Sequence, residues 1–350
     1  MRYQHVSLQT FGYVLPPVTL SSGAIEERLA PVYERLKLPF GRLELMSGIR
    51  QRRLWNNRTR PSDAAILAGR KTIATGGINV SEIECLIFAG VSRDMLEPAT
   101  ASFVHGGLGL SQDCLVFDIS NACLGFLDGM IMLANMIELG QVNCGLIVAG
   151  ETAEELLEST ISALLAKESL TRKTIKPSFA SLTIGSGAVG LIMRRDNGNS
   201  ERPRLIGASC IANTSYNRLC EGGQIMGANP GMNVTLMATD SEELLKRGIE
   251  TAALTWRKFL TILDWEPQSI DVYFCHQVGR AHAKLLFETL NIDPGKNFET
   301  LEYLGNVGSV SAPVTMAIGI EEKAFRRGQR AALLGIGSGI NCLMLGIEWP

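Results

Sequence analysis

Two kinds of hydrophobic spacing alternate along the chain. Uninterrupted apolar runs at Ile83–Val91 and Leu115–Phe117 are typical of strands that are buried on both faces of a sheet. Around them, apolar residues recur every three to four positions, which predicts helices at Ser22–Leu36, Ser62–Thr75 and Leu124–Ile137. Strands that alternate with helices in this way predict an α/β fold built in layers.

The same strand beginnings occur twice. SEIECLIFAG and SIDVYFCHQ align when Ile83 is matched with Ile270, at an offset of 187. The Gly-Gln pairs at Gly140 and Gly328, each followed by another apolar strand, align at an offset of 188. A repeat at nearly one offset predicts two halves of similar topology. The polar stretch Arg194–Arg204 has the composition of a linker, so we expect one half over residues 1–195 and the other over 205–350.

Composition sets limits on the class of protein. Of the 350 residues, 46% are hydrophobic and 19% are charged, which is enough apolar content for two sizeable cores. The formal net charge is -2 and there is no long basic run, which argues against nucleic acid as a partner. The arginines from Arg50 to Arg60 are the local exception. We interpret them as an exposed basic loop, the alternative being a site for a phosphate-bearing ligand.

Several other classes of site are not supported. The eight cysteines form no CxxC pair, and the first residues lack a basic segment followed by an apolar core. Zinc, a disulfide framework and a signal peptide are therefore not expected, and a reduced cytoplasmic setting is. His5, His105 and His282 lack the paired spacing of ligands, so we predict no metal. No apolar run reaches the ~20 residues of a membrane-spanning helix, so we expect no membrane span.

The loop GIGSG, which begins at Gly335, has the spacing of a partial dinucleotide-binding motif. Only Ile340–Pro350 follow Gly339, which leaves no room for the helix and for the acidic residue about 20 positions further on. We therefore predict no dinucleotide and no other cofactor.

The stretch DISNACLGFLDGM places Cys123 between a strand and the start of a helix. The positive end of the helix dipole and nearby free N–H groups would lower the pKa of this thiol from its usual ~8.5 and favour the nucleophilic thiolate. The alternative is a small buried cysteine beside two glycines, and for a single cysteine that is the commoner case. Other residues have to decide between the two.

Three further polar features follow predicted strands. His276 ends the strand DVYFC, Asn306 lies in the loop LGNVGSVSAP, and Gly335–Asn341 ends the strand ALL. Applied to Cys123, the offset of the repeat leads to the neighbourhood of Val310, inside the loop of Asn306, so the repeat places these two sites face to face. Because sites form at the carboxyl ends of strands in open parallel sheets, we expect all of these features to converge.

This set of groups suits one kind of chemistry. A neutral imidazole and an amide can hydrogen-bond a thioester oxygen as it becomes an enolate, and Gly-rich backbone can bring N–H groups to a second oxyanion. Together with a cysteine nucleophile, these groups predict the formation of a carbon–carbon bond.

The motifs also resemble a known family. NACLG at Cys123, HQ at His276, GN at Asn306 and the loop with Ser338 follow one another in this order along the chain. With SGIRQRR near the start, the pattern resembles the thiolase-fold condensing enzymes, specifically the ketoacyl-ACP synthase III branch. The resemblance covers nearly the whole chain, and the order and spacing of the motifs make it more specific than any one of them. It implies a five-layered αβαβα thiolase fold made of two pseudo-symmetric halves, and a homodimer.

The resemblance also implies a role for each residue. Cys123 would carry an acyl thioester, His276 and Asn306 would hold the carbonyl of the second substrate, and backbone N–H groups of Cys123 and Ser338 would form the oxyanion hole. Many members have glycine at the position of Ser338, but only the backbone donor is needed, so we expect the role to be kept. NVGSVSAP departs from the Thr-Ser-Ala run of many relatives, which leaves the shape of the pocket open.

RDMLEPATA, from Arg93 to Ala101, resembles a segment of the OleA-type enzymes, which join two fatty acyl-CoA molecules head to head. In those enzymes the equivalent glutamate reaches into the active site of the partner subunit. Malonyl-ACP forms a carbanion by losing CO2, whereas an unactivated acyl-CoA must lose an alpha proton to a base. We predict that Glu97 is this base. From the residues alone, a solvated carboxylate before Pro98 is the commoner interpretation.

The sequence thus predicts an acyltransferase that condenses two acyl-CoA thioesters to a 3-keto product through acyl-Cys123, in a homodimer in which Glu97 acts across the interface. The first alternative is a ketoacyl-ACP synthase III, which uses malonyl-ACP and therefore acyl-carrier protein as a partner, and in which Glu97 is dispensable. The second is a non-catalytic thiolase-fold subunit. The joint presence of Cys123, His276 and Asn306 argues against it.

Overall fold

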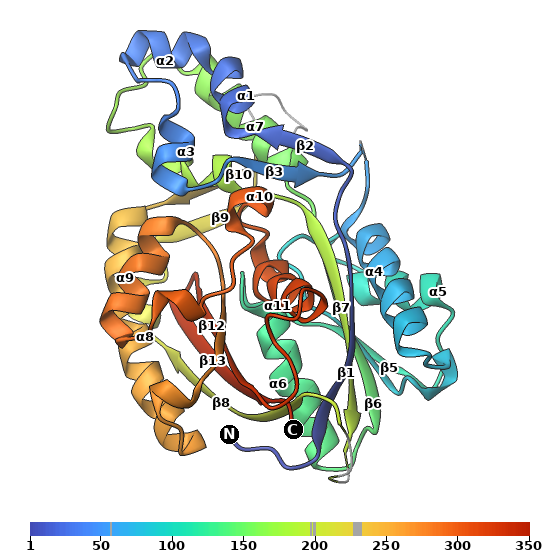
Figure 1. Cartoon of the computed structure of the whole chain (residues 1–350). Helices are drawn as coiled ribbons and strands as arrows, with labels where there is room; N and C mark the ends of the chain where they lie inside the picture. The colour runs from blue at the N-terminus through green and yellow to red at the C-terminus, as the bar shows by residue number, and fades with distance from the viewer. Residues whose placement is uncertain (57, 197, 199–200, 227–232) are drawn as a thin grey trace.

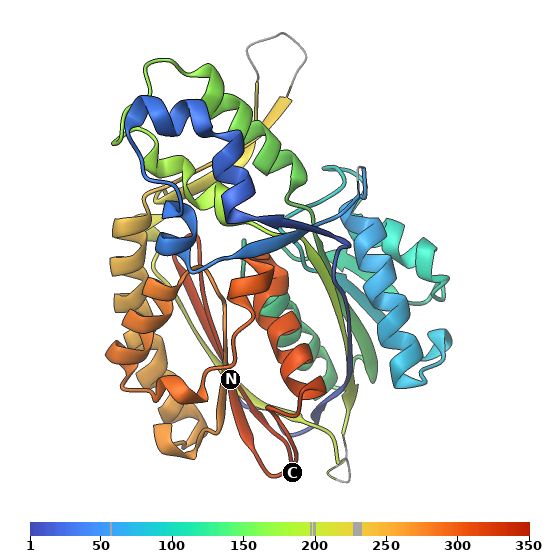
Figure 2. The same ribbon diagram turned by 45° about the horizontal axis from the view of Figure 1, so that its top comes forward.

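The computed structural model describes residues 1–350 except 57, 197, 199–200 and 227–232. Helices and strands form five successive layers across the molecule (Figure 1). One outer layer contains α4 (Pro61–Gly76) and α5 (Thr100–Leu108), the central layer α6 (Gly125–Glu138) and α11 (Ser311–Glu321), and the other outer layer α8 (Ser241–Leu263) and α9 (Arg280–Leu290). The two sheet layers lie between them, as the view in Figure 2 also shows. This is the predicted αβαβα arrangement.

The strands of both sheet layers are connected by hydrogen bonds in the order β11, β12, β13, β8, β1, β7, β6, β4, β5. Their bounds are Val272–Cys275, Arg330–Gly337, Asn341–Glu348, Arg204–Ala212, Val6–Val14, Gly187–Arg195, Cys144–Glu151, Cys85–Phe88 and Leu115–Asp118, in the same order. The two layers meet where β8 and β1 pair through Ser7 and Arg204. β4 runs parallel to β5 and β6, and β11 runs parallel to β12, whereas the other neighbours are antiparallel. The sheet is therefore mixed.

Equivalent elements recur at nearly the offset that the sequence shows. β4 begins at Cys85 and its counterpart β11 at Val272, and α6 begins at Gly125 and its counterpart α11 at Ser311. Both of these helices lie in the central layer (Figure 1). The division into halves at residues 195 and 205 stays a prediction, and residues 197 and 199–200 of the expected linker lie outside the described residues.

A group of smaller elements forms a cap over one end of the layers (Figure 2). The cap consists of β2 (Val18–Ser21), α1 (Ser22–Arg28), α2 (Ala30–Leu36), α3 (Arg42–Ser47), β3 (Gln51–Leu54), α7 (Glu154–Ala166), β9 (Cys220–Met226) and β10 (Asn233–Thr239). The short helix α10 (Leu301–Leu304) lies next to β3. The cap covers the carboxyl ends of β11 and β12, where the site described below is found.

Two helix predictions differ in outcome. The helix predicted at Ser62–Thr75 is confirmed as α4, within one residue at each end. The helix predicted at Ser22–Leu36 is instead two helices, because Pro31 lies in the first turn of α2 and has no N–H with which to continue α1. The cap of α1 is Ser21, whose hydroxyl accepts the N–H of Ala24.

The prediction that Leu115–Phe117 is a buried strand is wrong in one respect. β5 is a strand, but it pairs with β4 on one side and forms the edge of the sheet on the other. Leu115 and Val116 are therefore 52% and 39% exposed in the single chain. Exposed apolar side chains on an edge strand are a ready surface for pairing with another chain.

The longest described helix, α8, has 23 residues, but charged residues interrupt its apolar positions. Within the described parts of the chain, no helix is both long and apolar enough to cross a membrane.

Candidate active site

One cavity of about 810 Å³ brings together four of the five residues that the sequence singles out. Its wall includes Cys123, His276, Asn306 and Ser338, which come from four distant segments of the chain. Much of the remaining wall is apolar and belongs to the cap and to α8 and α9. The cavity therefore combines reactive groups with space for an apolar ligand.

A tight turn presents Cys123 just before α6. Ala122 has a φ of 45°, in the left-handed region that few residues other than glycine adopt. Asn121 fixes the turn, since its Nδ2 donates to Oδ2 of Asp128 at 2.7 Å and its Oδ1 accepts from Nδ2 of Asn341 at 2.8 Å. These bonds hold the cysteine at the start of the central helix.

Burial decides the charge of the Cys123 thiol. Burial, with a smaller contribution from the Glu151 carboxylate, raises the pKa of the thiol to about 12. The prediction of a lowered pKa is therefore wrong, because the loss of hydration outweighs the helix dipole. The thiol is protonated at neutral pH, so it needs a proton acceptor when it attacks a thioester.

His276 is a candidate acceptor in the wall of the cavity. Its backbone N–H donates to the Leu334 carbonyl at 2.8 Å, which ties it to β12. Burial, with a smaller contribution from His282, lowers the pKa of the His276 imidazole to about 4. Its buried Nδ1 has no hydrogen-bond partner among the described residues. A neutral imidazole of this kind can take up a proton or hydrogen-bond a carbonyl oxygen.

Asn306 is oriented by its own loop. Its backbone N–H donates to the Thr183 carbonyl at 3.0 Å, and its carbonyl accepts the N–H of Gly185 at 2.8 Å. Its side-chain Oδ1 accepts the N–H of Gly308 at 3.1 Å. Because the oxygen end of the amide is engaged in this way, the Nδ2 end is left to donate to a ligand in the cavity.

Ser338 lies in the loop between β12 and β13. The side-chain Nδ2 of Asn341 donates to the Ser338 carbonyl at 3.4 Å and to Oδ1 of Asn121 at 2.8 Å. A single amide thus connects this loop to the turn of Cys123. The two segments from which the predicted oxyanion donors come are fixed against each other.

The sequence of this chain is similar to a family of known enzymes. Residues 117–213 match the family of 3-oxoacyl-[acyl-carrier-protein] synthase III, and residues 260–349 match the C-terminal part of that enzyme family. The acyl-CoA:acyl-CoA alkyltransferase of Shewanella oneidensis is 42% identical to this chain over 100% of both proteins. The chain belongs to the 3-oxoacyl-[acyl-carrier-protein] synthase III family.

Solved structures place it near OleA within this family. An OleA of Xanthomonas campestris with one cysteine replaced by serine, bound to lauric acid and lauroyl-CoA, matches with a TM-score of 0.92 and 37% identity, over 99% of this chain and 100% of that one. A second structure of that OleA, with one glutamate replaced by alanine, matches with a TM-score of 0.93 and 37% identity, over 100% and 99%. The thiolase fold and the resemblance to OleA-type condensing enzymes are confirmed.

Glu97, the predicted base of this condensing enzyme, lies outside the cavity of the single chain. It is exposed, in the connection between β4 and α5, and does not belong to the described wall of the cavity. Asp118 fixes the end of this connection by accepting the N–H groups of Thr100 and Ala101, each at 2.8 Å. The role of Glu97 stays a prediction that requires a second subunit.

The arginine-rich motif SGIRQRR has a structural role at one position. Arg52 is completely buried in β3 and donates to Oγ of Ser22 at 3.1 Å and to the Leu182 carbonyl at 3.0 Å. Burial lowers the pKa of its guanidinium to about 10. The prediction of an exposed basic loop is therefore wrong for Arg52, and so is the alternative of a phosphate site there.

Sequence reasoning missed several groups at or near the cavity. His282, considered from the sequence only as a metal ligand, lines the cavity six residues after His276. Glu151 is buried at the end of β6, and the acid that ends this otherwise apolar strand was a signal that could have been used. Five cations also line the cavity and were not singled out, although three of them lie within five consecutive residues: Lys37, Arg42, Arg172, Lys173 and Lys176.

Proposed function

We propose that the protein joins two fatty acyl-CoA thioesters head to head by Claisen condensation and releases a 3-ketoacyl product. The observation that carries this proposal is the convergence of Cys123, His276 and Asn306 on one largely apolar cavity. The full-length similarity to an acyl-CoA:acyl-CoA alkyltransferase supports the choice of two acyl-CoA substrates.

Cys123 acts first in the proposed reaction. Its Sγ attacks the thioester carbonyl of the first acyl-CoA while His276 takes the thiol proton, which then leaves with CoA as its free thiol. The acyl group stays on Sγ. Backbone N–H groups of Cys123 and Ser338 stabilise the oxyanion that forms on the way. The neutral His276 and the protonated thiol support this order of events.

The second acyl-CoA supplies the carbon nucleophile. Its carbonyl oxygen binds between His276 and the Nδ2 of Asn306, and Glu97 of the partner subunit removes the alpha proton. The enolate carbon attacks the carbonyl of acyl-Cys123, a carbon–carbon bond forms, and the carbon–sulfur bond to Cys123 breaks. The cysteine leaves as a thiolate and is reprotonated, and Glu97 gives up the proton that it took from the alpha carbon. Two acyl-CoA molecules thus give one 3-ketoacyl-CoA and one CoA.

The charge around the cavity supports a CoA thioester as substrate. Lys37, Arg42 and Lys173 of the cavity wall can bind the phosphates of CoA, while the apolar part of the wall can bind the acyl chain. Lys176 is paired with Glu242 at 2.6 Å, and the guanidinium of Arg172 donates to the Leu36 and Lys37 carbonyls. We place the CoA moiety on the cap side, since Lys37 follows α2 and Arg42 begins α3.

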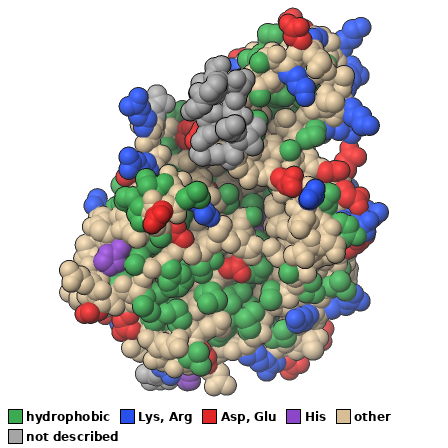
Figure 3. Space-filling model, turned by 180° about the vertical axis from the view of Figure 1, so that it is seen from behind, with side chains coloured by type: hydrophobic (Ala, Val, Ile, Leu, Met, Phe, Trp, Pro, Cys, Tyr) green, Lys and Arg blue, Asp and Glu red, His purple; other side chains and the backbone are tan. Residues whose placement is uncertain are grey.

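A homodimer is proposed because Glu97 lies outside the cavity of its own chain and can act as the base only in the cavity of a second subunit. The surface next to it is apolar, since Leu96 is 91% exposed and Val91, Met95 and the edge strand β5 also expose apolar side chains. Figure 3 shows hydrophobic side chains gathered over the lower half of the molecule seen from behind. Association of two β5 edges would cover the exposed side chains of β5 and bring each Glu97 toward the other subunit.

Product analysis by mass spectrometry tests the proposed function. The purified protein is incubated with lauroyl-CoA alone and, in parallel, with lauroyl-CoA and malonyl-ACP. A 3-keto product with two long chains from lauroyl-CoA alone is the expected result. Product only in the presence of malonyl-ACP would overturn the proposal in favour of a ketoacyl-ACP synthase III activity.

A further inference from the structure

Glu151 is a buried carboxylate that the proposed reaction does not use. It is the last residue of β6 and is 4% exposed. Its Oε1 accepts the N–H of Val91 at 2.8 Å, and the N–H and O–H of Ser309 at 3.2 and 2.6 Å. Its Oε2 accepts the N–H of Ser92 at 2.9 Å. Four donors from two loops therefore converge on one carboxylate.

The two loops are those that carry the groups for condensation. Val91 and Ser92 lie in the connection that leads from β4 to Glu97, and Ser309 follows Asn306 by three residues. Gly308 lies between them and packs so closely on Glu151 that a Cβ there would lie 3.1 Å from its carboxylate. The position of each loop is thus set against the same side chain.

A carboxylate suits this place because it only accepts hydrogen bonds. The amide of glutamine has one oxygen and one NH2 group, and that NH2 group would face N–H or O–H donors. At least one buried donor would then lose its acceptor, and the loop that carries it would have to move. The acyl-carrying turn is held differently, by Asn121 and its bonds to Asp128 and Asn341.

We propose that Glu151 is a positioning residue for the condensation step, which holds the loops of Glu97 and Asn306 in the relative placement that enolate formation requires. This inference rests on the proposed function, which gives both of these residues to the second substrate. Transfer of the first acyl group to Cys123 uses neither loop. Glu151 also makes a small contribution to the raised pKa of the Cys123 thiol, so its loss should leave acylation unchanged or slightly faster while condensation slows. The two half-reactions should thus separate.

The test is Glu151→Gln in the full-length protein, with each half-reaction followed separately. Intact mass and CoA release measure the formation of acyl-Cys123 from lauroyl-CoA, and mass spectrometry measures the two-chain product. We expect acyl-enzyme formation within about threefold of wild type and product formation about 10²-fold slower, the loss that a displacement of ~1 Å can cause. The thermal midpoint reports any general loss of stability.

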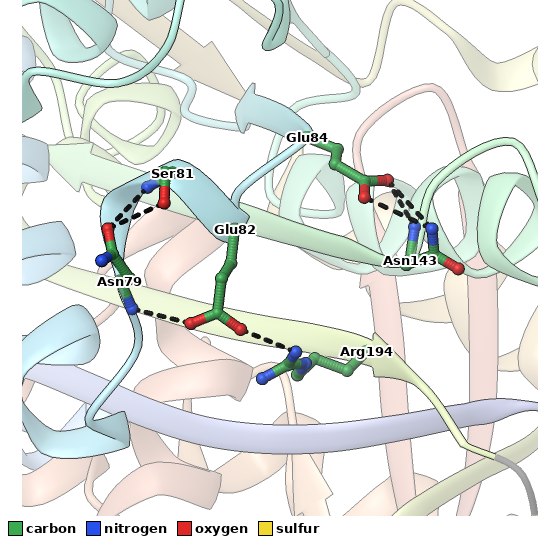
Figure 4. A network of polar contacts seen from close by, with 6 residues as sticks. All are labelled: Asn79, Ser81, Glu82, Glu84, Asn143 and Arg194. Carbon is green, nitrogen blue, oxygen red and sulfur yellow. Dashed lines mark hydrogen bonds and ion pairs between the residues drawn. The ribbon is translucent and has the colours of Figure 1, made fainter.

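A matched control lies at the opposite end of β4 and β6, the strands that lead to Val91 and to Glu151. Glu84 precedes β4 and accepts the backbone N–H of Asn143, which precedes β6, at 2.7 Å. Figure 4 shows this contact beside the network of Glu82 with Asn79 and Arg194. Glu84→Gln also replaces a carboxylate that accepts a backbone N–H. Both half-reactions should keep their wild-type rates in this variant.

Equal losses in both half-reactions of Glu151→Gln, or no loss in either, would overturn the inference. If this variant does not fold, Ser309→Ala decides, because it removes the 2.6 Å bond and leaves the carboxylate in place. Slower condensation with normal acylation in Ser309→Ala supports the inference, and wild-type rates overturn it. A wild-type protein that makes no product from lauroyl-CoA refutes the proposed function as well. Product at the wild-type rate from Glu151→Gln refutes only the role of Glu151.

Discussion

The two central helices begin with similar turns, but only the turn before α6 presents a nucleophile to the cavity. Ala122 before α6 and Gly308 before α11 are equivalent in the repeat, and both have positive φ, 45° and 54°. The next residues are Cys123, which lines the cavity, and Ser309, which is buried and donates its hydroxyl to Glu151. The repeated backbone supplies two equivalent positions, and the side chains decide that only one of them offers a nucleophile.

The strands β6 and β12 diverge in the same way. Glu151 ends β6, and its counterpart in the repeat is Gly337, which ends β12. Glu151 uses its charge to gather N–H groups from two loops, whereas Gly337 leads into the loop of Ser338 at the cavity. A carboxylate at Gly337 would repel the developing oxyanion, so the asymmetry of charge fits the proposed chemistry.

The largest expected effect comes from making the two helix starts alike. Cys123→Ser places a hydroxyl at both positions, and we expect acyl-enzyme and product formation to fall by about 10³-fold or more, because a hydroxyl is a much weaker nucleophile without a base built for it. Intact mass spectrometry after incubation with lauroyl-CoA measures the acyl-enzyme. Cys220→Ser, which alters another thiol of the cavity wall, should still form it. Loss of the acyl-enzyme in the Cys220 variant would place the nucleophile elsewhere.

The second prediction removes the donor that the loop before α11 contributes. Asn306→Ala should slow condensation about 10²-fold, since one hydrogen bond to the enolate oxygen is lost, while acylation of Cys123 proceeds normally. Single-turnover experiments with a preformed acyl-enzyme measure the second step alone. Equal slowing of acylation and condensation would show that Asn306 does not act in the condensation step alone.

The third prediction concerns the protonation of Cys123. Burial raises the pKa of its thiol to about 12, so the thiolate fraction should rise about tenfold for each pH unit between roughly pH 7 and 10. The rate of alkylation by iodoacetamide should rise in proportion. Peptide mapping separates Cys123 from the exposed Cys210. A rate that levels off below about pH 8.5 would mean that the helix dipole prevails over burial after all.

Features that depend on neighbours in sequence could be predicted well. The helices α4 and α6 follow from local periodicity, and the offset between the two halves indicated that Cys123 and Asn306 belong to one site, in line with their place in the wall of the same cavity. Features that depend on distant contacts could not. Glu151 has partners 60 and 158 residues away, so the acid at the end of an apolar strand could signal a special site but not the two loops that it holds.

The same limit explains the two wrong expectations about charge. Arg52 can be buried because the Ser22 hydroxyl of the cap and the carbonyl of Leu182, 130 residues away, accept its hydrogen bonds. The thiol of Cys123 is desolvated by surrounding protein that comes from many distant segments of the chain. The local pattern of a helix start does not reveal these segments.

The smallest expected effect tests whether the two turns are equivalent in energy. Gly308→Ala should lower the free energy of unfolding by about 1–2 kcal/mol, because a left-handed φ is unfavourable for alanine and the new Cβ meets Glu151. Ala122→Gly should change it by less than about 1 kcal/mol, since relief of the same strain is offset by the greater entropy of the unfolded chain. Denaturant unfolding of both variants measures the difference. A large stabilisation by Ala122→Gly would mean that the turn before Cys123 is more strained than the turn before Ser309. The two turns would then be alike in geometry but not in energy.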